Sequence, residues 1–182
     1  MRYLIGLVLA IVVIIFIIIR LLSGGGGETK QTLLEDYSMT DTTMRYVIDN
    51  PTQASQTHNQ VEIVVGRSDA TITVYQGYEG SVVRTKTYPM NTLAYRDFLR
   101  ALRLTGHYTV GNDDPNFKDE SGYCGLGNRF IYEIVDGSGT VIQHFWSTTC
   151  GEKTFRGEAA KVASLFKKQI PDYNKQVYGI KL

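Results

Sequence analysis

The N-terminal segment constrains this chain most, because it is almost entirely apolar. Residues 3 to 22 read YLIGLVLAIVVIIFIIIRLL, and residues 4 to 19 carry no charge. A helix that crosses the hydrocarbon core of a membrane needs about 20 such residues, and the stem of Arg20 can carry its charge to the interface. Because the run has no polar face to show to water, the sequence predicts a transmembrane signal-anchor helix over 3–22.

Two alternatives to an uncleaved anchor concern the end of this run. A cleaved signal peptide has an apolar region of about 7–15 residues before a small-residue site. The run here is longer, but residues 23 to 27 are small, so cleavage stays open. LLSGG resembles a bacterial lipoprotein box, yet Gly25 stands where that motif needs the lipidated cysteine. We therefore expect the helix itself to anchor the chain in the membrane.

The charge balance bears on the choice of partner. The chain has 19 basic and 18 acidic residues, and without Arg2 and Arg20 the remainder has 17 basic residues, close to neutrality. A nucleic-acid-binding domain needs a basic surplus that neutralises phosphates. We therefore expect no nucleic-acid partner.

The rest of the chain divides into a tether and one domain. SGGGGETKQ begins a flexible linker or stalk that we expect over residues 23–42. The remaining residues, 43–182, are enough for one modest hydrophobic core. The expected organisation is an anchor at 3–22, a stalk at 23–42 and an extracytoplasmic domain at 43–182.

The hydrophobic spacing within the domain predicts an α+β fold. Six segments have the composition or alternation of strands: MRYVIDN, VEIVVG, ATITVYQ, SVVRTKTYP, NRFIYEIVD and TVIQHFWSTT. Residues 91–106 and 157–170 have helical spacing instead, with Asn91 as the N-cap of the first. The expected inward positions are Tyr95, Phe98, Leu99 and Leu102 in the first helix, and Val162, Leu165 and Phe166 in the second. This order predicts an antiparallel sheet with two amphipathic helices on one face.

The two cysteines are expected to form a disulfide. Cys124 and Cys150 flank a predicted hairpin whose turn is Gly137-Ser138-Gly139, so antiparallel strands bring them opposite each other. A disulfide requires a Cα separation of about 4.4–6.8 Å, and such bonds persist outside the cytoplasm. The Lys and Arg residues near the two ends of the apolar run are nearly balanced, so the disulfide decides the expected topology, with the N-terminus cytoplasmic and the domain extracytoplasmic.

Free thiols, catalysis and metal binding are the alternatives for the cysteines. A catalytic cysteine needs a histidine base within bonding distance. His144 lies on the same predicted strand as Cys150 but far along it, and His107 can approach only through the fold. Two cysteines and three scattered histidines have no zinc spacing. We therefore expect no catalytic residue, no metal and no cofactor.

Three further motifs favour plain structural interpretations. CGLGN is followed by a strand rather than by the helix that a phosphate-binding loop needs. Gly137-Ser138-Gly139 lies between two strands, which is typical of a turn and not of a serine-hydrolase elbow. The acidic stretch 111–122 has oxygen ligands suited to calcium but lacks the order of an EF-hand, so a solvated loop is expected.

The tyrosines suggest a contact surface. The chain has 12 of them, many beside predicted strands, where most would line the rim of the core. The more specific hypothesis is a binding surface for protein or glycan, formed by Tyr75, Tyr78, Tyr123 and the single tryptophan, Trp146.

The order of several motifs resembles a known family. RYVIDNP, a YP before an amphipathic helix, GYCGLGNRFIYE, HFWSTTCG and LFKKQIPDYN follow one another over residues 45 to 182. In this order they resemble uncharacterised single-pass surface proteins of ultra-small, host-attached bacteria. The resemblance implies a cell-surface location and an ectodomain with paired cysteines, and it implies no chemistry.

Together these features predict a membrane-anchored extracytoplasmic domain that binds a protein or envelope component without catalysis. An inhibitor or chaperone-like factor for envelope enzymes is one alternative. An envelope hydrolase is another, and a pocket lined by His107 or His144 with an acidic residue would favour it.

Overall fold

The computed structural model describes residues 33–54, 56–112 and 119–180. The predicted anchor at 3–22 and the first ten residues of the predicted stalk lie outside these ranges, so the anchor stays a prediction. Within the ranges, none of the helices combines the length and the apolar character that a membrane crossing requires.

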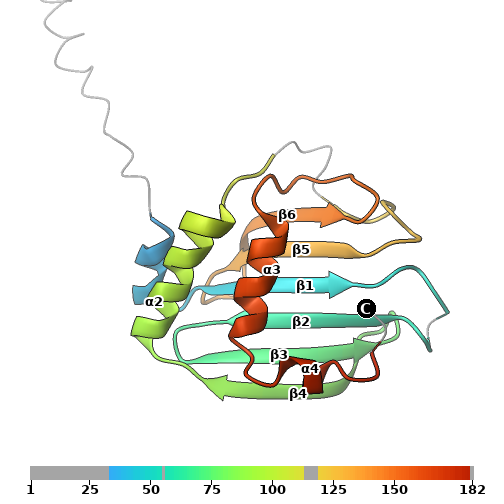
Figure 1. Ribbon diagram of the computed structural model, residues 1–182, viewed down its shortest axis with the longest axis horizontal. Helices are drawn as coiled ribbons and strands as arrows, with labels where there is room; N and C mark the ends of the chain where they lie inside the picture. Colours follow the sequence, from blue (N-terminus) through green and yellow to red (C-terminus); the bar gives the residue numbers. More distant parts are fainter. Residues whose placement is uncertain (1–32, 55, 113–118, 181–182) are drawn as a thin grey trace, which may run out of the picture. The chain divides into compact units, whose positions relative to one another are not determined.

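The domain is built on one six-stranded sheet in which every neighbouring pair is antiparallel (Figure 1). Its strand order is β4-β3-β2-β1-β5-β6. The strands are β1 (Thr43–Asp49), β2 (Asn59–Val65), β3 (Asp69–Gln76), β4 (Ser81–Pro89), β5 (Arg129–Val135) and β6 (Val141–Thr148). Strand β1 therefore lies inside the sheet and joins the β2–β3–β4 meander to the β5–β6 hairpin, whose turn contains Gly137-Ser138-Gly139 as predicted.

The helices follow β4 and β6 in the chain, and α2 and α3 lie across one face of the sheet (Figure 1). They are α2 (Thr92–Ala101), the π-helical turn η2 (Leu102–Gly106), α3 (Ala159–Lys168) and the short α4 (Tyr173–Gln176). The Asn91 side chain accepts a hydrogen bond of 2.9 Å from the Ala94 N–H, so the predicted N-cap is confirmed.

The main core lies between these helices and the sheet. Three cross-strand rows of β1, β2 and β3 face the helices: Met44–Val65–Ala70, Tyr46–Ile63–Ile72 and Ile48–Val61–Val74. Of the seven predicted inward helical positions, Leu165 alone is partly exposed. The α+β class, with helices on an antiparallel sheet, is thus confirmed for the described part of the chain.

The predicted boundary between stalk and domain at residue 43 is wrong. Residues Leu34–Met39 form a 3-10 helix, η1, that packs against α2. Leu34 is 2% exposed within the core, and Arg103 donates two hydrogen bonds to the Glu35 carboxylate at 2.6 and 2.7 Å. The compact unit begins at Leu33. The sparse apolar residues of this segment suggested a loose stalk, but its leucine completes the core.

Candidate functional site

The helix-free face of the sheet is polar at both ends and apolar in the middle. Because side chains alternate between faces along a strand, neighbouring residues of β1, β5 and β6 form rows across it. From the start of β1 to its end the rows are Arg45–Glu133–His144, Val47–Ile131–Trp146 and Asp49–Arg129–Thr148. This face, the loops beside it and a groove on the helical side are the candidate sites.

The first row belongs to a ladder of alternating charges. His144 bonds the carboxylate of Glu133 through Nδ1 at 2.7 Å and that of Glu120 through Nε2 at 3.0 Å. Arg45 bonds Glu133 at 2.5 Å and Glu62 at 2.8 Å on its other side. Each cation thus lies between two carboxylates, which is the arrangement of a structural ion-pair network.

The pKa values of this network follow from its geometry. Hydrogen bonds that His144 donates to the Glu120 and Glu133 carboxylates raise its pKa to about 9, although burial opposes the shift. Burial alone would raise the pKa of Glu133, but the hydrogen bonds of His144 and Arg45 outweigh it and lower the pKa. At neutral pH His144 is therefore protonated with both ring nitrogens engaged, which does not suit a general base.

A strap, defined as residues 119–128, lies over the β5–β6 half of this face. It contacts the body through the Glu120–His144 pair and through the Tyr123 ring, whose centroid lies 4.9 Å from that of Trp146. Trp146 is 0% exposed. The prediction that Trp146 belongs to a contact surface is therefore wrong, since the ring fills a second, smaller core with Val47 and Ile131.

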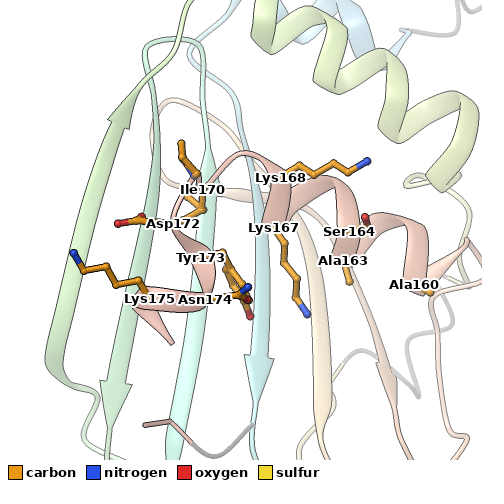
Figure 2. Close-up of a pocket in the computed structure, with 11 residues that line it drawn as sticks. Ala160, Ala163, Ser164, Lys167, Lys168, Ile170, Asp172, Tyr173, Asn174 and Lys175 are labelled. Atoms are coloured by element: carbon orange, nitrogen blue, oxygen red, sulfur yellow. The ribbon is translucent and has the colours of Figure 1, made fainter. Parts of the chain in front are cut away.

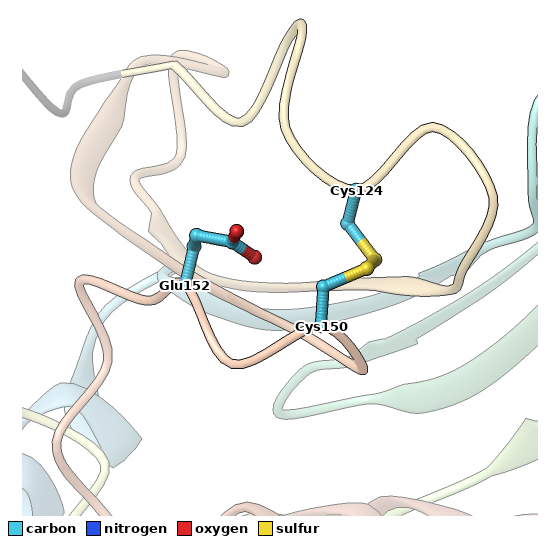
Figure 3. Close-up of side chains that lie close together, drawn as sticks. All are labelled: Cys124, Cys150 and Glu152. Atoms are coloured by element: carbon cyan, nitrogen blue, oxygen red, sulfur yellow. A yellow bond between two sulfur atoms is a disulfide. The ribbon is translucent and has the colours of Figure 1, made fainter.

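The strap is closed by the predicted disulfide. Cys124 and Cys150 are bonded, with their Cα atoms 5.6 Å apart (Figure 3). A side chain on Gly127 would collide with Cys124 and Thr149, so this glycine permits the close approach of the crosslink. Gly127 of the CGLGN segment thus has a packing role.

Glu152 adds a carboxylate beside the disulfide (Figure 3). Its oxygen and the two sulfur atoms lie within 4.8 Å of one another, the only such group of potential metal ligands found in the described ranges. Metal binding by cysteine requires thiolates. While the disulfide is intact, neither sulfur is a thiolate, so the group does not offer a metal site in this state.

Three loops meet at the end of the sheet where β1 finishes. The Thr52 N–H donates to the Gly125 carbonyl of the strap at 2.7 Å. The next residue, Gln53, exchanges two hydrogen bonds with the Tyr78 hydroxyl, at 2.9 and 2.7 Å. We call residues 51–54, 77–80 and 123–128 the distal loop surface.

Buried charge supports this surface from below. The Asp49 carboxylate lies 3.0 Å from Nε2 of His58 and 2.5 Å from the Arg129 guanidinium. Burial raises the pKa of Asp49 more than the neighbouring Arg129 guanidinium lowers it. The His58 ring, which is 5% exposed, stacks on Tyr78 with centroids 4.3 Å apart. The loops are thus bonded both to each other and to the sheet.

Leu126 protrudes from the distal loop surface. It is 95% exposed, between two glycines and two residues from the crosslinked Cys124. Tyr78, whose hydroxyl is bonded to Gln53, is 54% exposed. The surface therefore presents apolar side chains on loops that disulfide, hydrogen bonds and stacking hold in place.

A groove on the opposite, helical side lies between α3 and α4 (Figure 2). It has a volume of about 890 Å³ and is lined by Ala160, Ala163, Ser164, Lys167, Lys168, Ile170, Pro171, Asp172, Tyr173, Asn174 and Lys175. Three lysines and one aspartate give this lining a net charge of +2.

The structure divides the four residues of the predicted contact surface. Tyr78 and Tyr123 both lie within the distal loop surface, but the Tyr123 ring packs on Trp146. Tyr75 is half-buried on the helix-free face, where burial and the Glu62 carboxylate raise its pKa. His107 is exposed at the end of η2. Leu126 was not among the predicted contact residues, although it is the one aliphatic residue in the segment SGYCGLGN.

Comparisons with known protein families and with curated proteins find no match to this chain. The functional interpretation therefore rests on the geometry of the molecule itself.

Proposed function

We propose that this chain is a membrane-tethered, extracytoplasmic binding protein, without catalytic activity, that engages a protein partner through the distal loop surface. Leu126 is the residue that enters a pocket of the partner, and Tyr78 widens the contact. The apolar run at 3–22 supports the anchoring, and the disulfide supports a location outside the cytoplasm.

The observation that carries the proposal is the 95% exposure of Leu126 on a crosslinked loop. A single exposed leucine is ordinary on a protein surface. Here, however, the disulfide and the Thr52–Gly125 hydrogen bond fix its position. Binding costs less conformational entropy when the contact residues are already ordered, and apolar anchors on fixed supports are typical of interfaces.

The place of the surface within the domain also suits binding. The described chain enters through η1, next to the start of β1 at Thr43, and β1 runs from there to Asp49 beneath the distal loop surface. Seven extended residues span about 20 Å. The surface thus lies at the far end of β1 from the point where the tether joins the domain.

A site-specific crosslinking experiment tests the proposal. A photoreactive amino acid replaces Leu126 in one variant and Met39 in the other, in the full chain expressed by its native cells. Met39 is a matched control because it is 75% exposed but lies in η1. We expect a discrete crosslinked protein at position 126 that is absent at position 39, and loss of that partner in the Leu126→Asp variant during affinity isolation.

Two results would contradict this function. One is the same set of crosslinked proteins from both positions, which would indicate random collision. The other is retention of the partner by the Leu126→Asp variant. If the partner is an enzyme that loses activity when bound, the inhibitor alternative applies to the same surface.

A further inference from the structure

The groove between α3 and α4 brings three lysines together. Arg45, Arg67, Arg103 and Arg129 each form an ion pair with a carboxylate. In contrast, none of the groove lysines pairs with a carboxylate within residues 33–54, 56–112 and 119–180. The groove therefore holds positive charge that no described carboxylate pairs with.

The one acidic residue of the lining is already occupied. Asp172 accepts a hydrogen bond from the Tyr88 hydroxyl on one oxygen and a bond of 3.0 Å from the Gln176 amide on the other. Arg84 adds a further cation beside α4, because its guanidinium donates to the main-chain carbonyls of Lys175 and Gln176. No salt bridge joins Asp172 to a groove lysine among the described residues, and an incoming anion meets a lining with a net charge of +2.

The positions of the lysines indicate an elongated ligand. Lys167 lies beside Tyr173 near the middle of the groove, and Lys168 and Lys175 extend to either side (Figure 2). Beyond Lys167 and Lys168, the α3 wall consists of small side chains, Ala160, Ala163 and Ser164 (Figure 2). Charges spread along an open channel suit a chain of repeated anionic groups better than one small anion.

The chemistry of the lining favours phosphate groups without bases. All three cations of the lining are lysines, and lysine is a common point-charge partner of phosphate. Tyr173 is the only aromatic residue among the described residues of the lining. The Lys167 ammonium lies 5.2 Å from the centroid of its ring, which packs against the core. A protein that binds single-stranded nucleic acid instead offers open aromatic faces on which bases stack.

The buried hydroxyl of Tyr173 adds a polar group without a function in the fold. Its oxygen is buried and has no hydrogen-bond partner in the described part of the chain. Buried hydroxyls are nearly always bonded. A small shift of the ring toward the channel would give this hydroxyl a ligand oxygen as its acceptor.

We infer that this groove binds a linear polymer of phosphodiester-linked polyol units, with Lys167, Lys168 and Lys175 contacting successive phosphates. This site is separate from the distal loop surface. It would hold the domain against a charged surface polymer while the loops engage a protein.

Binding of fluorescent poly(glycerol phosphate) to the full chain in zwitterionic micelles tests the inference. We expect the triple variant K167Q/K168Q/K175Q to weaken binding at least about tenfold at 50 mM salt and to reduce the salt slope by about 2, as expected for lost phosphate contacts. The matched control R96Q/R100Q/K153Q removes three exposed cations elsewhere and should retain affinity within about twofold of wild type, because screening limits distant charges. K168Q/K175Q, which keeps the Lys167–Tyr173 contact, should show an intermediate loss even if the triple variant is misfolded.

Three outcomes would overturn the inference. The first is no binding of the polymer, and the second is an equal loss in the control variant. The third is tighter binding of oligothymidylate with the same number of phosphates, or of vesicles rich in phosphatidylglycerol, which would assign the groove to nucleic acid or to lipid. The distal loop proposal is unaffected by any of these, since its crosslinking test uses other residues.

Discussion

The two faces of the sheet are stabilised in different ways. The helix-covered face buries a continuous apolar core in which rings such as Phe166 and Tyr46 lie 5.3 Å apart. The helix-free face has only a small apolar cluster around Trp146, between two charged rows. On the helix-free face the strap covers the sheet, as the helices do on the opposite face. The disulfide and the ion pairs hold the strap in this position. We infer that the apolar core alone stabilises the helix-covered face, whereas the helix-free face depends on the disulfide and the ion pairs.

The largest effect is expected from the core of the covered face. Phe166 is 0% exposed and touches the rings of Tyr46, Phe98 and Tyr108. Phe166→Ala should lower the free energy of unfolding by about 3–5 kcal/mol, since it removes transfer energy and leaves a cavity. Urea unfolding with and without reductant measures this. A loss that appears only in the reduced protein would contradict the independence of this face.

The crosslink should have the next largest effect. The disulfide joins residues 26 apart. Replacing both cysteines by serine should lower stability by roughly 3–4 kcal/mol through the unfolded state. Thermal unfolding of the double variant against the oxidised wild type checks the loss. An unchanged melting temperature would show that the strap needs no crosslink.

A smaller and pH-dependent effect is expected at the charge ladder. The His144 pKa rises from 6.5 in the unfolded chain to about 9 in the fold, so its contribution is complete below pH 6.5 and is lost as the pH rises through about 9. Glu133 acts oppositely, because its lowered pKa gives stability that is lost as the pH falls below 4.5. His144→Gln should cost on the order of 1–3 kcal/mol at pH 6.

Unfolding curves of wild type and His144→Gln at pH 6 and pH 9.5 measure this contribution. We expect the difference between the two proteins to shrink strongly at the higher pH. An equal difference at both values would mean that the ion pairs do not hold the strap.

The smallest effect on stability is expected at Leu126. Because its side chain is 95% exposed, Leu126→Ala should change the free energy of unfolding by less than about 0.5 kcal/mol. If the proposed function is right, the same variant weakens partner binding clearly. A large loss of stability would instead make Leu126 a packing residue.

The same contrast explains how much the sequence could predict. Periodicity revealed the covered face, because Tyr95, Phe98 and Leu99 recur at the spacing of a helix. The disulfide followed from the symmetry of Cys124 and Cys150 about a hairpin turn. Both signals are local, or depend on a single turn.

The rest depends on long-range pairing that leaves no periodic signal. Glu120 meets His144, 24 residues away, only because the strap folds back over β6. The sequence predicted Trp146 on the surface, because no neighbouring residue in the chain indicates that the Tyr123 ring covers it. The burial of Leu34 likewise needs α2, which is distant in sequence.

The most direct test of the difference between the faces is amide hydrogen exchange of the full chain, with and without reduction of Cys124–Cys150. Strap-associated amides such as Gly127 and Thr149 donate main-chain hydrogen bonds of 3.0 Å. We predict that both are protected in the oxidised protein and exchange rapidly after reduction, while α2, α3 and the strands beneath them stay protected. Rapid exchange of the strap before reduction, or equal loss of protection on both faces after it, would contradict the account.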